Sequence, residues 1–257
     1  MKIFLCVDAA QATALAGAQV QQQIMRKPES VLGFATGGTM EALYAELIRL
    51  HRHQALSFAG VRSFNLDEYL GLSGTHSHSY SHYMHQHLFD HVNIQPQHIH
   101  LLQGDAADPV VEAQAYEQRI QAVNGIDLQL LGLGENGHIG FNEPSSSLAS
   151  RTRVKRLAPD TLAANQRYFS ADISQPTHAL TMGIGTIMDA RQVVMLALGA
   201  KKADAVAHMI EGPISARWPA SVLQMHPQTT VILDAPAAQH LACRDYYTAV
   251  HPMGLVE

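Results

Sequence analysis

Short strand-length segments alternate with longer segments of helical period, and this alternation constrains the fold more than any other feature of the sequence. The strands predicted in this way cover residues 31–35, 61–66, 98–102, 126–133, 192–198 and 229–234. The run at 126–133 is almost entirely apolar, which is typical of a strand that is covered on both faces. Helical spacing follows the first strand and recurs at about 79–90, 108–123 and 201–210. The pattern predicts an α/β fold with a parallel sheet and helices on both faces.

The organisation along the chain favours one domain over residues 1–257. We find no linker, internal repeat or low-complexity tract. Residues 145–175 are polar and weakly periodic, and a long irregular insert in a compact domain is often a lid or a binding loop. The sequence therefore predicts a single domain with a lid at about 145–175.

The charge balance excludes several classes of partner. The 17 Lys and Arg residues face 22 Asp and Glu residues, so no general positive field is available for nucleic acid or for an anionic membrane. An anionic ligand must instead be bound locally. No segment is long enough to span a membrane, Asp8 interrupts the apolar start of the chain, and Cys6 and Cys243 are too few for a disulfide framework. We expect a cytoplasmic protein.

Polar groups follow three of the predicted strands, where parallel α/β sheets bind their ligands. Residues 36–39 (TGGT) place two glycines where a strand turns into a helix. Their backbone N–H groups and the helix N-terminus could bind a phosphate, although a tight turn without a ligand explains them equally well. Asp67 and Glu68 follow the next strand. A carboxylate there could act as a general base, but position alone favours a helix cap or a solvated turn.

The third group, residues 134–144 (GENGHIGFNEP), is the most informative. Its three glycines let the backbone approach a ligand, while Asn136, His138, Asn142 and Glu143 supply amide, imidazole and carboxylate groups within eight residues. A histidine beside a carboxylate is a usual general acid/base pair. We therefore predict catalysis in this loop, with a hydrogen-bonded structural turn as the alternative.

Basic residues and histidines complete the set of candidates. Arg167 in the predicted lid and Lys202 at a helix start are candidate anion ligands, with surface solvation as the alternative. Six of the 16 histidines lie between His76 and His91. Because no HExxH motif or nearby cysteine accompanies them, we expect the solvated face of a helix rather than a metal site.

With these residues in view, the chain resembles the glucosamine-6-phosphate deaminase family, whose members are also called glucosamine-6-phosphate isomerases. The resemblance is an ordered series that covers nearly the whole chain. Its parts are LGFATGGT at 32–39, FNLDEYLGL at 64–72, LGLGENGHIGFNEP at 131–144, SRTRV at 150–154, ALTMGIGTIMDA at 179–190, LALGAKKA at 196–203 and EGPISARWPASVLQMHP at 211–227.

The resemblance implies a modified Rossmann-like fold and the hydrolytic deamination of D-glucosamine 6-phosphate to fructose 6-phosphate and ammonia, without a cofactor or metal. It implies that Asp67 moves a proton between C2 and C1 of the sugar. It also implies that His138 opens the sugar ring with the help of Glu143 and Asn136. The phosphate would be held by Gly38, Thr39, Arg167 and Lys202.

The chain departs from the family pattern at two positions. Asn136 stands where some members carry Asp, and an amide can orient an imidazole but cannot stabilise its charged form as a carboxylate does. Met40 stands where proline is frequent, which we expect to change the start of the helix rather than the contact with the ligand.

Regulation, assembly and substrate stay open at this stage. Ser146, Arg153 and Lys155 resemble residues with which hexameric members bind the activator N-acetylglucosamine 6-phosphate, whereas the short segment after Tyr247 fits a monomer or dimer equally well. A homo-oligomer is thus one alternative. The competing functions are galactosamine-6-phosphate deaminase, a 6-phosphogluconolactonase-like enzyme and a non-catalytic sugar-phosphate sensor. The presence of Asp67, His138 and Glu143 favours an enzyme that transfers protons.

Overall fold

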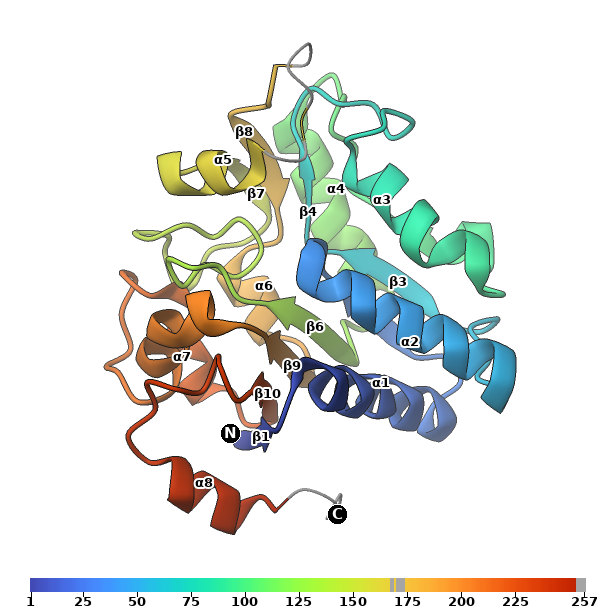
Figure 1. Ribbon diagram of the computed structural model, residues 1–257. Coiled ribbons are helices and arrows are strands. Elements are labelled where there is room, and N and C mark those ends of the chain that lie inside the picture. Colours follow the sequence, from blue (N-terminus) through green and yellow to red (C-terminus); the bar gives the residue numbers. More distant parts are fainter. Residues whose placement is uncertain (167–168, 170–173, 253–257) are drawn as a thin grey trace.

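A computed structural model describes residues 1–166, 169 and 174–252. A parallel sheet forms the centre of the protein (Figure 1). In the described part of the chain it has seven strands, in the order β1-β10-β9-β6-β2-β3-β5, and every neighbouring pair is parallel. The strands are β1 (Lys2–Cys6), β2 (Val31–Phe34), β3 (Arg62–Asn65), β5 (Ile99–His100), β6 (Leu128–Gly132), β9 (Gln192–Ala197) and β10 (Thr229–Asp234). The predicted α/β fold with a parallel sheet is confirmed.

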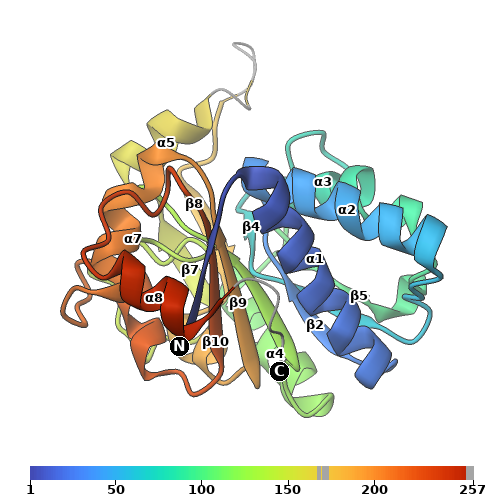
Figure 2. The same cartoon turned by 60° about the horizontal axis from the view of Figure 1, so that its bottom comes forward.

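Helices cover both faces of this sheet. Figure 2 shows α1 (Ala9–Arg26) and α2 (Gly38–Gln54) on one side, and α7 (Ala203–Ile210) and α8 (Arg244–Val250) on the other. Further α-helices are α3 (Tyr80–His87), α4 (Pro109–Ala122) and α6 (Ile184–Met188). The strands of the middle of the sheet are buried almost without interruption, which explains the apolar runs in the sequence.

A second, smaller sheet lies at one end of the molecule. It is antiparallel and joins β4 (Asp67–Tyr69), β8 (His178–Thr181) and β7 (Arg153–Arg156) in that order. Figure 1 shows it at the top, beside the helix α5 (Pro159–Asn165). The sequence interpretation missed this sheet, because its strands are three or four residues long and β7 reads RVKR. It also took 145–175 to be irregular, whereas the described part contains a strand and a helix.

The register of the large sheet places the predicted polar segments side by side. The strand β6 pairs with β2 on one side and with β9 on the other. All three strands run in the same direction, so the segments that follow Phe34, Gly132 and Ala197 leave the sheet at the same end, where the strands have their carboxyl termini. The strand β3 pairs with β2 and leads directly into β4. The carboxyl ends of these strands thus meet at one place, as expected for a ligand site in such a sheet.

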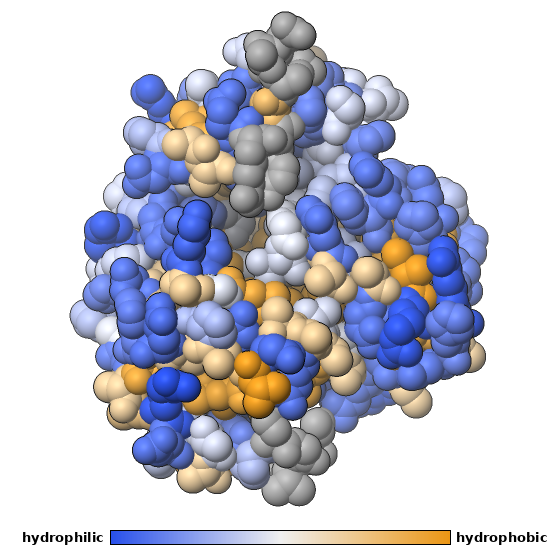
Figure 3. Space-filling view, viewed as in Figure 1, coloured by the Kyte–Doolittle hydropathy of each residue, from blue (hydrophilic) through white to orange (hydrophobic). Residues whose placement is uncertain are grey.

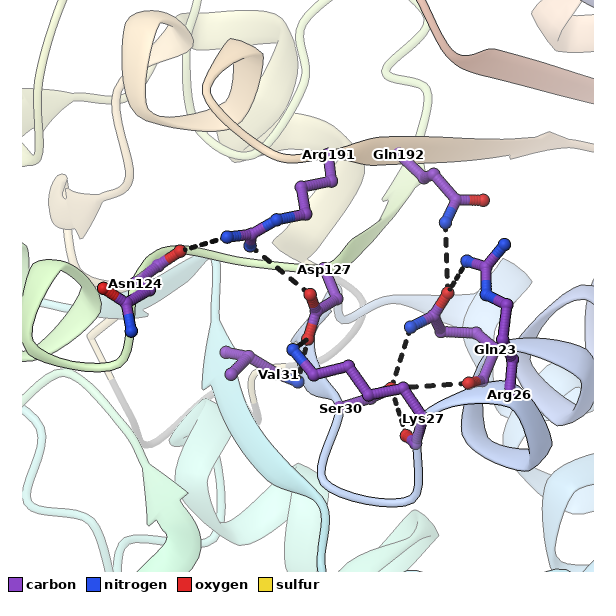
Figure 4. Close-up of polar contacts among 9 residues, drawn as sticks. All are labelled: Gln23, Arg26, Lys27, Ser30, Val31, Asn124, Asp127, Arg191 and Gln192. Carbon is purple, nitrogen blue, oxygen red and sulfur yellow. Dashed lines mark hydrogen bonds and ion pairs between the residues drawn. The ribbon is translucent and has the colours of Figure 1, made fainter.

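At the opposite end of the sheet, where the strands begin, a polar network surrounds Asp127, just before β6 (Figure 4). The buried carboxylate accepts hydrogen bonds from the Lys27 ammonium group at 2.7 Å and from the Val31 N–H at 2.8 Å, and it lies 3.3 Å from the Arg191 guanidinium. These contacts satisfy a buried charge and join the starts of β2, β6 and β9. The network therefore stabilises the end of the sheet that lies away from the candidate site.

No helix in the described ranges is both long and apolar enough to cross a membrane. Figure 3 shows hydrophilic side chains over much of the face that contains α5 and α2.

Candidate active site

A cavity of about 1030 Å³ lies where the carboxyl ends of β2, β6 and β9 meet the small sheet. Its walls come from the turn after β2, from β4, α3 and α5, and from the segments after β6 and β9. The predicted site residues that line it are Gly38, Thr39, Asp67, Asn136, His138 and Lys202. Glu143 lies behind this wall, in contact with Asn136. Arg167, the fourth predicted phosphate ligand, lies outside the described residues.

The turn at 36–39 opens the N-terminus of α2 toward the cavity. The helix begins at Gly38, and its N-cap Gly37 has φ 108°, a left-handed conformation that favours glycine. No side chain caps this end of the helix in the described part of the structure. The half-buried Lys202 lines the same cavity from the 3₁₀ turn after β9. A 17-residue helix that points its first N–H groups at a cavity wall, with a lysine nearby, is suited to an anion.

Asp67 is a buried carboxylate at the start of β4. Its side chain makes no hydrogen bond or ion pair with the described residues, and the residue is 5% exposed. Burial, followed by the charge of Glu68, raises the pKa of Asp67 to about 8. A methyl group added at Gly140 would lie 3.4 Å from its Oδ2 atom, so the carboxylate adjoins the loop of residues 134–144 (the glycine loop). An unpaired carboxylate that takes up a proton near neutral pH is suited to proton transfer.

Asn136 connects the two ionisable groups of the glycine loop. Its Nδ2 donates to Oε2 of Glu143 at 2.9 Å, while its Oδ1 lies 2.7 Å from Nδ1 of His138 and accepts from the His138 backbone N–H at 3.2 Å. Nδ1 of His138 also lies 3.5 Å from Oε2 of Glu143. The carboxylate can only accept, so the amide must turn its NH₂ group to Glu143 and its oxygen to the imidazole.

This arrangement selects the tautomer of His138. Since the amide oxygen faces Nδ1, that nitrogen carries a proton, and in the neutral ring Nε2 keeps its lone pair. Nε2 has no hydrogen-bond partner among the described residues, and the ring lines the cavity. His138 can therefore accept a proton at Nε2 from a bound molecule.

Glu143 supplies a permanent negative charge behind the imidazole. Burial alone would raise its pKa, but the nearby His138, with Nδ1 at 3.5 Å, and the Ala158 N–H, which donates to Oε1 at 3.1 Å, lower the pKa to about 2. The carboxylate is thus ionised throughout the neutral range. It also joins the glycine loop to Ala158, the N-cap of α5.

Two glycines explain the shape of this loop. A Cβ at Gly134 would lie 2.4 Å from ring atoms of His138, so only glycine lets the ring lie against the backbone. Gly137 has φ 82°, and a Cβ there would lie 2.6 Å from the Trp218 ring. Trp218 in turn stacks on His208 of α7, with ring centroids 4.1 Å apart. The loop is thus held between the sheet and a segment from the end of the chain.

Several residues of the cavity wall were missed in the sequence. Tyr80 and Tyr83 of α3 line it without belonging to a recognised motif, and Arg217, beside Trp218, lines it although the segment 211–227 was given no role in the site. The resemblance at 211–227 was the available signal for Arg217 and Trp218.

The histidine cluster differs from the predicted solvated helix face. Of the six side chains, His91 is exposed and the other five are half-buried. His78 and His87 line the cavity, and His87 packs on Tyr83 with ring centroids 4.4 Å apart. The prediction holds only in part, because His78, His85 and His87 pack against aromatic rings. Within the described residues, no three His, Cys, Asp or Glu side chains are grouped to hold a metal ion.

Two of the three residues predicted to bind an activator, Ser146 and Arg153, contact the segment that carries Glu143. Ser146 is buried, and its Oγ atom has no hydrogen-bond partner among the described residues. Arg153 and Lys155 lie two residues apart on β7, and the Arg153 guanidinium donates to Oδ1 of Asn142 at 2.9 Å. Burial lowers the pKa of Arg153. Ser146 and Arg153 therefore contact the same loop that carries His138 and Glu143.

Comparison with known proteins gives consistent matches over most of the chain. Residues 7–232 match the family model described as glucosamine-6-phosphate isomerases/6-phosphogluconolactonase. The chain is 53% identical over 244 residues to glucosamine-6-phosphate deaminase of Hahella chejuensis (strain KCTC 2396), covering 95% of this chain and 93% of that protein. It is 47% identical to glucosamine-6-phosphate deaminase 2 of Bacillus subtilis (strain 168), covering 94% and 98%.

Solved structures show the same fold. A protein described as a monomeric glucosamine-6-phosphate deaminase superposes with a TM-score of 0.91 at 43% identity, covering 93% of this chain and all of the other. A 6-phosphogluconolactonase from Trypanosoma cruzi superposes with a TM-score of 0.76, covering 94% and 97%. Its identity is only 22%, so it shows a shared fold alone.

Proposed function

Because the chain belongs to the family of glucosamine-6-phosphate isomerases and 6-phosphogluconolactonases, we propose that it is an enzyme that deaminates D-glucosamine 6-phosphate to fructose 6-phosphate and ammonia. The relatives of about 50% identity bear the name of that deaminase. The observation that carries the proposal is the placement of an unpaired carboxylate, Asp67, and an oriented imidazole, His138, in one cavity with an anion site. A deaminase needs all three.

Binding would begin at the phosphate group. The N–H groups at the start of α2, with Gly38 and Thr39, and the ammonium group of Lys202 offer donors to its oxygens. We keep Arg167 as a fourth proposed ligand from the sequence. A compact anion site of this kind suits a chain with a net charge of −5.

Ring opening would use His138. Nε2 accepts the proton of the C1 hydroxyl group, the C1–O5 bond breaks, and the imidazolium delivers that proton to O5, which leaves an open-chain aldehyde and a neutral imidazole. The imidazolium that forms is stabilised by the nearby Glu143 carboxylate, at 3.5 Å. Asn136 keeps the ring in the required tautomer.

Isomerisation and loss of ammonia would follow at Asp67. Its carboxylate takes the proton from C2 and delivers it to C1, while one proton moves through solvent from the amine nitrogen to O1, so that the amino aldehyde becomes a C2 imine with a C1 alcohol. Water adds to C2, and the resulting carbinolamine releases ammonia and leaves the ketone of fructose 6-phosphate. Each step uses only the substrate, water and protons.

An ammonia-release assay tests this function against its alternatives. Glucosamine 6-phosphate, galactosamine 6-phosphate and 6-phosphogluconolactone are supplied separately, with ammonia measured for the first two and acid release for the third. We expect ammonia from glucosamine 6-phosphate. Ammonia from the galactose isomer only, or lactone hydrolysis only, would replace the proposed substrate. Binding without any turnover would instead support a sensor.

Asn136 gives a prediction for the pH profile. In Asn136→Asp, a second carboxylate would adjoin the imidazole and favour its protonated form, so a higher pH is needed to free Nε2. We expect kcat at the optimum to stay within a few-fold of wild type, with the optimum about one pH unit higher. The measurement is kcat against pH for both proteins. Superimposable profiles would contradict the role given to the amide.

Allosteric control is a second proposal. We propose that N-acetylglucosamine 6-phosphate binds near Ser146, Arg153 and Lys155, because an unpaired buried hydroxyl and the Arg153 guanidinium adjoin the catalytic loop there and Lys155 lies two residues from Arg153 on β7. The expected result is sigmoidal kinetics that become hyperbolic when N-acetylglucosamine 6-phosphate is added. Hyperbolic kinetics with and without it would remove this proposal.

A further inference from the structure

Glu68 is a buried carboxylate next to the proposed base, and no step described so far uses it. The residue is 2% exposed. Asp67 and Tyr69 line the cavity from β4, whereas Glu68, between them, does not. Successive side chains of a strand point to opposite faces, so Glu68 lies behind the strand that carries the base.

Three backbone N–H groups converge on this carboxylate. Oε1 accepts from the N–H groups of Tyr69 and Tyr80, both at 2.8 Å, and Oε2 accepts from that of Ser81 at 2.9 Å. Tyr80 and Ser81 are the first two residues of α3. Glu68 therefore caps a helix that lies twelve residues further along the chain, in addition to the local cap by Ser79.

The helix α3, which Glu68 caps, contacts the turn at residues 36–39, where we propose that phosphate binds (the phosphate turn). Tyr83, one turn into α3, donates its hydroxyl hydrogen to the Gly37 carbonyl group at 2.9 Å. Gly37 is the N-cap of α2. A continuous series of contacts thus runs from the strand of Asp67 through Glu68 and α3 to the turn proposed to bind phosphate.

Glu68 also acts on its neighbours by charge. Burial raises its pKa to about 7, although its three N–H donors lower it. No lysine, arginine or histidine in the described ranges forms an ion pair with it. Five ionisable groups interact by charge with one or both of the two carboxylates. They are Asp105 in the loop after β5, Tyr44 of α2, Tyr69 of β4, Tyr80 of α3 and Tyr116 of α4.

We propose that Glu68 is a positioning residue for the reaction: it fixes the strand of Asp67 against α3, and through Tyr83 it fixes the phosphate turn relative to the base. This role rests on the proposed deaminase function only for its effect on turnover. Its effect on anion binding is independent of that function.

Glu68→Gln tests the role with little change in size. A glutamine side chain has one acceptor oxygen, so its NH₂ group would face one of the three N–H donors. We expect the dissociation constant for inorganic phosphate and the KM for glucosamine 6-phosphate to rise about tenfold, as for a lost charge-assisted hydrogen bond. Since a negative charge beside Asp67 is removed, the acid limb of kcat should move about one unit to lower pH.

A matched control separates this role from a general loss of stability. Glu112 is another buried carboxylate that accepts a loop N–H, from Gln103 at 3.2 Å. It also accepts from the Arg119 guanidinium at 2.6 Å, and it does not line the cavity. Glu112→Gln should lower stability without moving the acid limb or the phosphate affinity. If Glu68→Gln behaves in the same way, Glu68 is only a structural residue and the inference is wrong.

Tyr83→Phe provides a second test that does not depend on the folding of the Glu68 variant. Removing one hydroxyl group should raise the dissociation constant for inorganic phosphate about threefold to fivefold and leave the pH profile of kcat unchanged. An unchanged affinity in Tyr83→Phe would overturn the link to the phosphate turn. Wild-type protein that binds phosphate but releases no ammonia would contradict the proposed function, while the phosphate measurements on both variants would still decide the role of Glu68.

Discussion

Asp67→Asn is expected to lower kcat for glucosamine 6-phosphate by about 10³-fold, the size of a lost general base, and at the same time to stabilise the folded protein above neutral pH. The loss follows because an amide cannot take the proton from C2. Substrate binding should change little, since Asp67 is not among the proposed phosphate ligands. Glu135→Gln, which replaces an exposed carboxylate on the wall of the same cavity, is the matched control and should retain most of the activity.

The gain in stability follows from the raised pKa of Asp67. Between about pH 4 and pH 8 the unfolded chain ionises at this position while the folded protein still binds the proton. The folded protein therefore binds more protons than the unfolded chain in this window, and its stability falls as the pH rises. Above the folded pKa of about 8 the carboxylate remains as a buried unpaired charge and the whole penalty applies.

Chemical denaturation at several pH values measures this effect. Asparagine carries no such charge, so the variant should exceed wild type by about 1 to 3 kcal/mol at pH 8, because burial of the amide offsets part of the linkage gain. The difference should shrink toward pH 4. A variant that is less stable than wild type at pH 8, or that keeps more than a tenth of the wild-type kcat, would contradict the role assigned to Asp67.

The parts of the fold that were predicted correctly share one physical origin. The strands β6 and β10 are buried on both faces, so their sequences are apolar runs with clear ends, and Thr229–Asp234 was predicted with the observed limits. The helix α1 was overlooked, because its buried stripe consists mainly of small residues such as Ala12 and Ala16. The small sheet left no periodic signal in the sequence, since its strands are short and take their partners from distant segments.

The candidate site divides in the same way. The rule that ligands bind at the carboxyl ends of parallel strands was sufficient to group residues 36–39, Asp67 and the glycine loop. It could not indicate that α3 and α5 complete the cavity, because these helices reach it through tertiary contacts. It also could not show that Asn136 lies between His138 and Glu143, because hydrogen-bond direction depends on the loop conformation. Local sequence identifies chemical groups, whereas their mutual orientation is a property of the folded chain.

That orientation leads to the second large effect, in Glu143→Gln. The new amide can donate from its NH₂ group to Asn136. This favours rotation of the Asn136 amide, so that its oxygen faces the glutamine and its Nδ2 faces the imidazole. His138 would in that case carry its proton on Nε2, which could no longer accept one from the C1 hydroxyl group. The imidazolium would also lose its neighbouring charge. We expect kcat to fall about 10² to 10³-fold, the range for an impaired general base.

A double variant distinguishes this mechanism from simple damage to the loop. In Asn136→Asp with Glu143→Gln, the pair again holds one carboxylate and one amide. The carboxylate introduced at position 136 would accept from Nδ1 of His138, and the glutamine would donate to it across the 2.9 Å contact. The tautomer with a free Nε2 is thereby restored, so kcat should recover at least about tenfold over Glu143→Gln alone, as expected for residues that interact directly. A double variant no more active than the single one would show that the position of the carboxylate, rather than the orientation of the imidazole, is what the reaction requires.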